Sequence, residues 1–386
     1  MFADRTNWNL APNRLSEALA RHRAAGKPLI DLTVSNPTEC GFVYDEQAIL
    51  DALRNPAALK YEPDPKGLLV ARQAIARYYA ERGVNVATDD IVVTTSTSEA
   101  YSFVFRLLCN PADEVLVPAP SYPLFGFLAD IQDVKLVHYP LIYDHGWQID
   151  FHSLEQAVTP RTRAVIVVHP NNPTGHFTKG HEIAKLKEIC ASKELAIIAD
   201  EVFLDFAMDG SRPESFAASA GIPDVLTFAM SGISKIAGLP QMKVAWIVVD
   251  GPERLKTNAV GRLEVIADTY LSVNTAAQMA LPALLGQRHA FQRQMLDRVR
   301  ANLNELDRQL SKHPTFSRLG VEGGWYSVLR GPATDSDDDL AINLLHQGVS
   351  VHPGGYYDFA ANGYLVLSLI LPGHTFFGGI STLLVL

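Results

Sequence analysis

The sequence has little cysteine, little positive charge and no long apolar run. Cys40, Cys109 and Cys190 stand far apart among 386 residues and form no CxxC pair, which argues against a disulfide framework and against a thiolate zinc site. The 33 Lys and Arg residues are outnumbered by 42 Asp and Glu residues, and the net charge of −9 argues against a nucleic-acid partner. We therefore expect a small-molecule partner and no bound metal.

Segments that direct a chain to a membrane or out of the cell are also missing. The first 25 residues carry charges throughout and lack the apolar core of a secretory signal. Apolar runs such as 164–168 and 244–249 are far shorter than the ~20 residues that cross a bilayer. These features favour a cytoplasmic protein with no membrane partner.

The composition is that of a chain that folds, with 47% apolar and 19% charged residues. Its length suggests two or three domains. Short β-branched runs alternate with helical stretches, and these runs lack the apolar/polar alternation of strands with one solvated face. The expected strands are Ile91 to Thr95, Glu114 to Val117, Ala164 to Val168, Ala196 to Ala199, Val225 to Ala229 and Val244 to Val249. The predicted fold class is α/β, a mainly parallel sheet sandwiched by helices.

Three segments are expected along the chain. Residues 1–44 are rich in loops and form an N-terminal segment that packs on the smaller domain or on a partner subunit. Residues 45–275 form the large domain that contains the parallel sheet. From about Ala276 the pattern changes to a long helix, and residues 276–386 form a smaller α+β domain with strands near 324–329 and 365–369.

Polar residues follow the expected strands at the points where the strands end. Ligands bind at the carboxyl ends of the strands in open α/β sheets, so these residues can meet in one crevice. They are Ser96 to Glu99 after the first strand, Ser121 and Tyr122 after the second, Asn171 to Gly175 after the third, Asp200 at the end of the fourth, and Ser231 to Lys235 after the fifth.

Taken singly, each of these residues also has an ordinary interpretation. Ser96 and Glu99 have the spacing of a helix capping box, which need not bind a phosphate. Asp200 follows an apolar run, where a buried anion needs a partner, but it can also be a surface aspartate. Lys235 lies among small residues and can have the lowered pKa that imine chemistry needs, although a solvated lysine is the commoner case.

The order of the motifs is more specific than any one of them. Ser-Thr-Ser, Tyr, Asn-Pro-Thr-Gly, Asp-Glu and Ser-Lys-x-x-Gly-Leu-Pro follow one another along the chain. In this order they resemble the class I/II aminotransferases of the fold type I pyridoxal 5′-phosphate enzymes, over a region that extends from Asp31 through Tyr61 and Gly67 to Gly354. The resemblance implies pyridoxal 5′-phosphate as cofactor and a homodimer with shared active sites.

By position in the family pattern, two residues would be catalytic. Lys235 would form the Schiff base with the cofactor and move the substrate proton, and Asp200 would keep the pyridine nitrogen protonated. Asn172 would hydrogen-bond the cofactor's O3′, and Tyr122 would stack on its ring.

The remaining site residues also follow from the resemblance. Thr97, Ser98 and Lys243 would hold the phosphate, and Tyr61 would reach it from the second subunit. The cofactor-binding set is completed by Ser231 and Ser234, and the substrate-binding positions are Ser35, Asn172 and Val366.

Three positions depart from the family pattern. Phe203 stands where a tyrosine usually donates to O3′. Lys243 stands where an arginine usually contacts the phosphate, and a lysine cannot form the bidentate fork of an arginine. Val366 takes the place of the arginine that binds the substrate α-carboxylate, and no Lys or Arg follows Arg330. The identities of the donor and acceptor therefore stay open.

The function implied is that of an aminotransferase, which moves an amino group between an amino substrate and an oxo acid through a Lys235 Schiff base. One alternative is a pyridoxal-phosphate lyase, decarboxylase or oxidase acting on an atypical amine, and another is a non-catalytic cofactor-binding sensor. Such sensors usually carry a DNA-binding module, for which the chain has neither the extra length nor the basic charge. The joint presence of Lys235, Asp200 and Asn172 favours catalysis.

Overall fold

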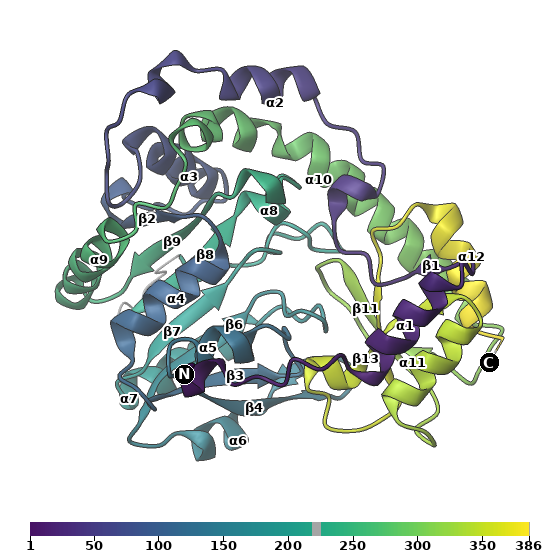
Figure 1. The fold of residues 1–386 in the computed structure, drawn as a ribbon. Helices are drawn as coiled ribbons and strands as arrows, with labels where there is room; N and C mark the ends of the chain where they lie inside the picture. The colour runs from purple at the N-terminus through teal and green to yellow at the C-terminus, as the bar shows by residue number, and fades with distance from the viewer. Residues whose placement is uncertain (218–224, 386) are drawn as a thin grey trace.

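A computed structural model describes residues 1–217 and 225–385, which form a large sheet, a smaller sheet and a two-stranded pair with helices around them (Figure 1). The large sheet has eight strands in the order β2-β9-β8-β7-β6-β3-β4-β5. Neighbouring strands from β8 to β4 are parallel, whereas β9 is antiparallel to both of its neighbours and β5 is antiparallel to β4. Its strands are β2 (Ile91–Thr94), β3 (Glu114–Ala119), β4 (Lys135–Tyr143), β5 (Trp147–Ile149), β6 (Thr162–Val168), β7 (Ala196–Asp200), β8 (Thr227–Gly232) and β9 (Ala245–Asp250).

The large sheet separates two hydrophobic cores. In β6, Val165 and Val167 belong to one core, and Ile166 between them belongs to the other. Because both faces are covered, the central strands are apolar without alternation, as the sequence predicted. The first core is packed from α3 (Leu69–Glu81), α6 (Phe151–Ala157) and α7 (Gly180–Ser192), and the second from α4 (Thr97–Leu108), α5 (Phe125–Asp130) and α9 (Glu253–Asp268).

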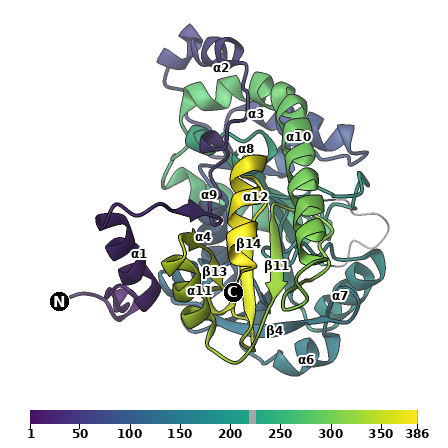
Figure 2. The same cartoon turned by 90° about the vertical axis from the view of Figure 1, so that its right-hand side faces the viewer.

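The smaller sheet is antiparallel throughout, in the order β10-β11-β14-β13. The long helix α10 (Thr275–Leu310) runs from the large sheet to this smaller one, where it lies beside α12 (Gly373–Leu383), as Figure 2 shows. The strands are β10 (Ser317–Arg318), β11 (Tyr326–Arg330), β13 (His352–Pro353) and β14 (Tyr364–Ser368), and α11 (Asp337–His346) packs next to them.

Residues 14–31 of the N-terminal segment lie on the smaller sheet's side of the molecule, whereas its first residues reach the large domain, where the Trp8 indole donates a hydrogen bond to Asp130 at 2.8 Å. Helix α1 (Arg14–Ala24) packs against α11, and β1 (Ile30–Asp31) pairs in parallel with β12 (Val349–Ser350). Helix α2 (Glu46–Leu53) packs against α10, and the short α8 (Ile233–Ile236) follows β8 directly. The 3-10 turns are Asp4–Thr6, Pro37–Glu39, Pro56–Leu59, Thr88–Asp90, Pro240–Met242 and Gly354–Tyr357. The segment boundaries at residues 44 and 275 stay predictions.

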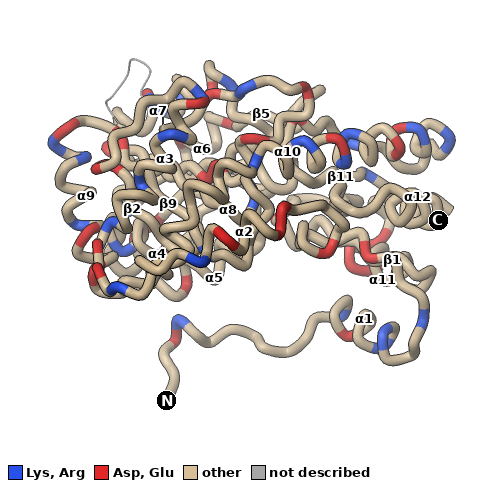
Figure 3. Tube along the Cα trace, turned by 90° about the horizontal axis from the view of Figure 1, so that it is seen from above, with Lys and Arg blue, Asp and Glu red and all other residues tan. Residues whose placement is uncertain are grey.

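The predicted fold class is confirmed. All the predicted strands are present within a few residues of the expected ends, and α10 begins at Thr275 close to the expected change of pattern. Strands β4 and β5 of the large sheet were not predicted from the sequence, and β4 has several exposed residues and contains Pro140. Figure 3 shows Lys and Arg mixed with Asp and Glu over the surface. Among the described residues no helix has the length and apolar character needed to cross a membrane.

Candidate active site

A cavity of about 240 Å³ lies where the carboxyl ends of the parallel strands meet the smaller sheet. Eight of the predicted site residues line it: Ser35, Thr97, Ser98, Tyr122, Asn172, Asp200, Ser234 and Lys235. They come from segments up to two hundred residues apart. The prediction that the residues following the expected strands meet in one crevice is therefore confirmed for those of the eight that follow such a strand.

Asp200 ends β7 and is buried at the floor of this cavity. Its carboxylate accepts hydrogen bonds from the Tyr101 hydroxyl at 3.1 Å and from the Val202 backbone N–H at 3.2 Å. Burial nevertheless dominates and raises the pKa of Asp200 to about 6. The ionised Asp200 carboxylate at this buried position therefore favours a ligand that places a positively charged group next to it.

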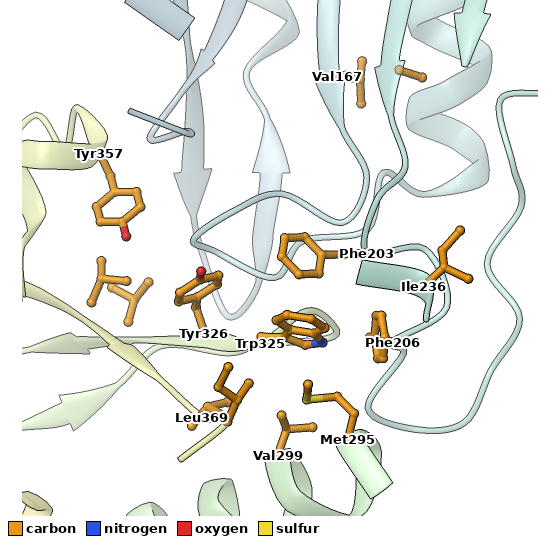
Figure 4. Close-up of a cluster of buried hydrophobic side chains, with 14 of the residues drawn as sticks. Val167, Phe203, Phe206, Ile236, Met295, Val299, Trp325, Tyr326, Tyr357 and Leu369 are labelled. Carbon is orange, nitrogen blue, oxygen red and sulfur yellow. The ribbon is translucent and has the colours of Figure 1, made fainter. Parts of the chain in front are cut away.

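Lys235 enters the cavity from α8, immediately after β8. Its Nζ lies 4.9 Å from the centre of the Trp325 ring and 5.5 Å from that of Phe203, and Figure 4 shows these two rings side by side. The apolar surroundings lower the pKa of Lys235 to about 8, against the opposing charge of Asp200. A lysine with this pKa is partly neutral near neutral pH and can act as a nucleophile.

The N-terminus of α4 forms another wall. Ser96 is the N-cap, with its Oγ accepting the Glu99 N–H at 3.1 Å, and the Glu99 carboxylate accepts the Thr95 N–H at 2.7 Å. The Ser96 half of the predicted capping box is therefore present, whereas the Glu99 carboxylate bonds the residue before the N-cap. Thr97 and Ser98, the first two residues of the helix, present hydroxyl groups to the cavity, where the helix dipole favours an anion.

Asn172 is held by the loop between β6 and α7. Within this loop Asn171 Oδ1 accepts a hydrogen bond from the Thr174 hydroxyl at 2.9 Å, which fixes the turn and leaves the neighbouring Asn172 side chain facing the cavity. Asn172 is 8% exposed, and its Oδ1 has no hydrogen-bond partner within the described chain. Because a buried polar atom without a partner is unfavourable, this atom indicates that the cavity accommodates a polar ligand.

Four predicted residues do not line the cavity. Ser231 is buried, and its hydroxyl donates to the Glu201 backbone oxygen at 3.3 Å. Lys243 is exposed in a left-handed conformation with φ 53°, and Tyr61 is 78% exposed on the outer surface. Val366 is buried within β14.

Sequence reasoning missed two tyrosines. Tyr101 lies one turn into α4 and holds Asp200, and Tyr326 lines the cavity from β11, where burial raises its pKa to about 12. Both looked like ordinary core residues, because neither belongs to a motif. Their contacts with Asp200 and Ser35 join segments about 100 or more residues apart, which no local pattern shows.

A mainly parallel sheet with a lysine, an aspartate and a helix N-terminus at one carboxyl-end cavity defines a fold type I pyridoxal-phosphate protein. The model of the family "Aminotransferase class I and II" matches residues 27–369, and the chain belongs to this family. Pyridoxal 5′-phosphate is the cofactor of its members. This confirms the resemblance seen in the motifs.

Curated relatives and solved structures agree with this assignment. Glutamate-pyruvate aminotransferase AlaA of Escherichia coli (strain K12) is 33% identical over 262 residues, which span 68% of this chain and 64% of that protein. The Haemophilus influenzae protein of the same name is 28% identical over 92% of this chain and 89% of its own length. An Escherichia coli aminotransferase structure has a TM-score of 0.88 at 26% identity, covering 99% of this chain and 96% of that one. Alanine aminotransferase from Pyrococcus furiosus has a TM-score of 0.89 at 24% identity, covering 99% and 98%, and shows the same fold.

The residues present fit the family's cofactor. A pyridine nitrogen needs an acidic partner, which Asp200 can supply, and a phosphate suits the hydroxyl-lined start of α4. The unpartnered Oδ1 of Asn172 offers a further polar contact.

Proposed function

We propose that the protein is a pyridoxal 5′-phosphate-dependent aminotransferase, which moves an amino group from an amino substrate to an oxo acid. The observation that carries this proposal is the convergence of Lys235, Asp200 and the unpartnered Asn172 amide on one cavity. The pKa of the buried Lys235, lowered to about 8, suits both imine formation and proton transfer.

The bound cofactor supplies an electron-accepting ring that stabilises negative charge at the substrate's amine-bearing carbon. Asp200 would keep a proton on the ring nitrogen, and the Tyr101 hydroxyl donates a hydrogen bond that keeps its carboxylate in place. Asn172 and Tyr122 would position the ring. The hydroxyl groups of Thr97 and Ser98 at the helix start would hold the phosphate.

Lys235 performs the proton transfer. Its Nζ would hold the cofactor, and as a neutral amine it would accept the proton that leaves the substrate's amine-bearing carbon. The rings of Phe203 and Trp325 restrict water around this nitrogen, which keeps a neutral amine available at physiological pH.

We further propose a homodimer in which Tyr61 contacts the phosphate of the partner's site, where Lys243 can add a positive charge. Tyr61 and Leu59 are 78% and 92% exposed, and such large apolar side chains on the surface suit a subunit contact. Ser231 then has a supporting role, since its hydroxyl fixes the backbone next to Asp200.

The direct test of the proposed function is borohydride reduction of the reconstituted protein followed by peptide mapping. We expect the label on Lys235. Lys235→Ala should retain the cofactor and lose turnover by several orders of magnitude, because it removes both the attachment point and the proton carrier. A label on another lysine, or full activity of the variant, would refute the assignment.

A second measurement separates transamination from other reactions of this cofactor. An amine donor should convert the cofactor's aldehyde spectrum to that of its amine form, and an added oxo acid should restore it. Release of carbon dioxide, or consumption of oxygen without restoration, would identify a decarboxylase or an oxidase instead.

A further inference from the structure

The cavity offers very little positive charge to a substrate. Of the described residues that line it, only Asp200 and Lys235 carry charged side chains. Lys235 is assigned to the reacting carbon in the proposed function, and its lowered pKa reduces its value as a permanent cation. The lining therefore holds no Lys or Arg that is free to pair with a carboxylate.

The smaller sheet also presents uncharged side chains close to the cavity. Directly opposed residues of antiparallel strands point to the same side, so the pairs Tyr326↔Ser368 and Val328↔Val366 share one side of the sheet. Tyr326 lines the cavity, and the side toward the substrate therefore carries hydroxyl groups and valines. Arg330 lies on that side too, but four residues farther along β11, roughly 13 Å away, and is exposed.

His352 pairs with Val366 from the other neighbouring strand and is the next candidate for a cation. Burial lowers the pKa of His352 against the opposing charge of Asp31, and its Nδ1 lies 2.9 Å from the Tyr357 hydroxyl. The imidazole is therefore neutral at neutral pH and already has a hydrogen-bond partner.

Arginines of the N-terminal segment do not reach the cavity. Helix α1 packs on α11, and its three arginine side chains are exposed and engaged with carboxylates. The pairs are Arg14 with Asp339 at 2.7 Å, Arg21 with Glu17 at 3.5 Å, and Arg23 with Asp31 at 3.6 Å. An anchor from this segment would require α1 to leave its place on α11.

We propose that the amino donor presents an uncharged group where an α-amino acid presents its carboxylate, so that the substrate class is primary amines and amino alcohols. This inference rests on the proposed function. A carboxylate directed toward the side of the smaller sheet that carries Tyr326, Val328 and Val366 would lose its hydration without gaining an ion pair, which is unfavourable. A hydroxymethyl group would keep a hydrogen bond to Tyr326 or Ser35 and place no charge against the valines.

The experiment compares two ligands that differ only in this group, 2-aminoisobutyric acid and 2-amino-2-methylpropan-1-ol. Neither carries a hydrogen on the amine-bearing carbon, so both bind without the proton transfer that Lys235 performs. Dissociation constants come from titrating the holoenzyme and following its visible absorbance. We expect the alcohol to bind the wild-type protein at least about tenfold more tightly than the acid. The reason is that the carboxylate of the acid finds no charged hydrogen-bond partner in the cavity.

Val366→Arg should shift this preference toward the acid by about tenfold or more, because it adds a bidentate partner for a carboxylate. Val366→Met, a long uncharged replacement, is the matched control and should leave the preference unchanged. If wild type binds the acid as tightly as the alcohol, the inference is wrong, and this comparison needs no variant to fold. Failure of the proposed function would show separately, as no conversion of the cofactor to its amine form by any amine.

Discussion

Asp200 is the residue at which function conflicts most clearly with stability. Burial raises its pKa from 3.8 to about 6, so between these pH values the folded protein binds more protons than the unfolded chain. Stability therefore falls as the pH rises through this window, and the unfavourable contribution is complete above about pH 6. A pKa shift of this size lowers the free energy of unfolding by ~3 kcal/mol.

We expect Asp200→Asn to increase the free energy of unfolding of the cofactor-free protein by up to ~3 kcal/mol at pH 7. The gain should vanish below about pH 4, where both states bind the proton. Urea unfolding at the two pH values measures it, and Asp144→Asn, at a residue whose side chain is 79% exposed, is the control. A gain that does not depend on pH would contradict the burial argument.

Phe203 is the residue that we expect to influence the pKa of the bound cofactor. Its ring lies 5.5 Å from the Lys235 nitrogen and 6.2 Å from the ring of Tyr326. A phenol at this place would donate a hydrogen bond to the ionised O3′ of the cofactor and favour the deprotonated form of its link to Lys235.

Phe203→Tyr is therefore expected to lower the pKa of the visible chromophore in a spectroscopic pH titration. Tyr326→Phe is the companion variant, because the Tyr326 hydroxyl lines the same cavity. An unchanged pKa in Phe203→Tyr, together with a raised one in Tyr326→Phe, would mean that Tyr326 already supplies the hydrogen bond.

Among the elements, α4 connects local sequence to ligand binding most directly. The Ser96 cap satisfies a free N–H of the helix and fixes where the first turn begins, and that turn carries Thr97 and Ser98 into the cavity. Loss of the cap should therefore affect both folding and cofactor affinity.

We expect Ser96→Ala to cost about 1 kcal/mol of stability and to weaken cofactor binding as well. Ser336→Ala is the matched control, because Ser336 caps α11 in the same way, with its Oγ accepting the Asp339 N–H at 3.1 Å, and does not line the cavity. Thermal unfolding and cofactor titration measure the two effects. Equal cofactor affinities in both variants would show that the start of α4 does not hold the phosphate.

At the scale of the whole molecule, the proposed homodimer makes a prediction about shared sites. Heterodimers that combine one Lys235→Ala subunit with one Tyr61→Phe subunit should contain one site with both native residues, provided that Tyr61 acts across the interface. We expect these heterodimers to show about half of wild-type activity, whereas each variant alone stays impaired. Activity no higher than that of the single variants would place Tyr61 in its own subunit's site.

The sequence by itself determined most of the large sheet and most of the cavity. The central strands are buried on both faces, so their apolar runs are visible without any tertiary information, and the residues after them meet because parallel strands end at one edge. Lys235, Asp200 and Asn172 were found in this way. Strand β4, next to the edge strand β5, was missed because its exposed side chains break that apolar signal.

Only the tertiary structure decided what surrounds these residues. Tyr101 reaches Asp200 across 99 positions of the chain, and Tyr326 enters the cavity through the register of β11 with β14. Strand register and the packing of α1 on α11 are set by contacts distant in sequence. They place Val328 and Val366 on the side of the smaller sheet from which Tyr326 enters the cavity, and they leave no arginine among the described residues that line it. Local motifs thus contain the reactive residues of the site, whereas the packing of separate elements determines which charged groups surround a substrate.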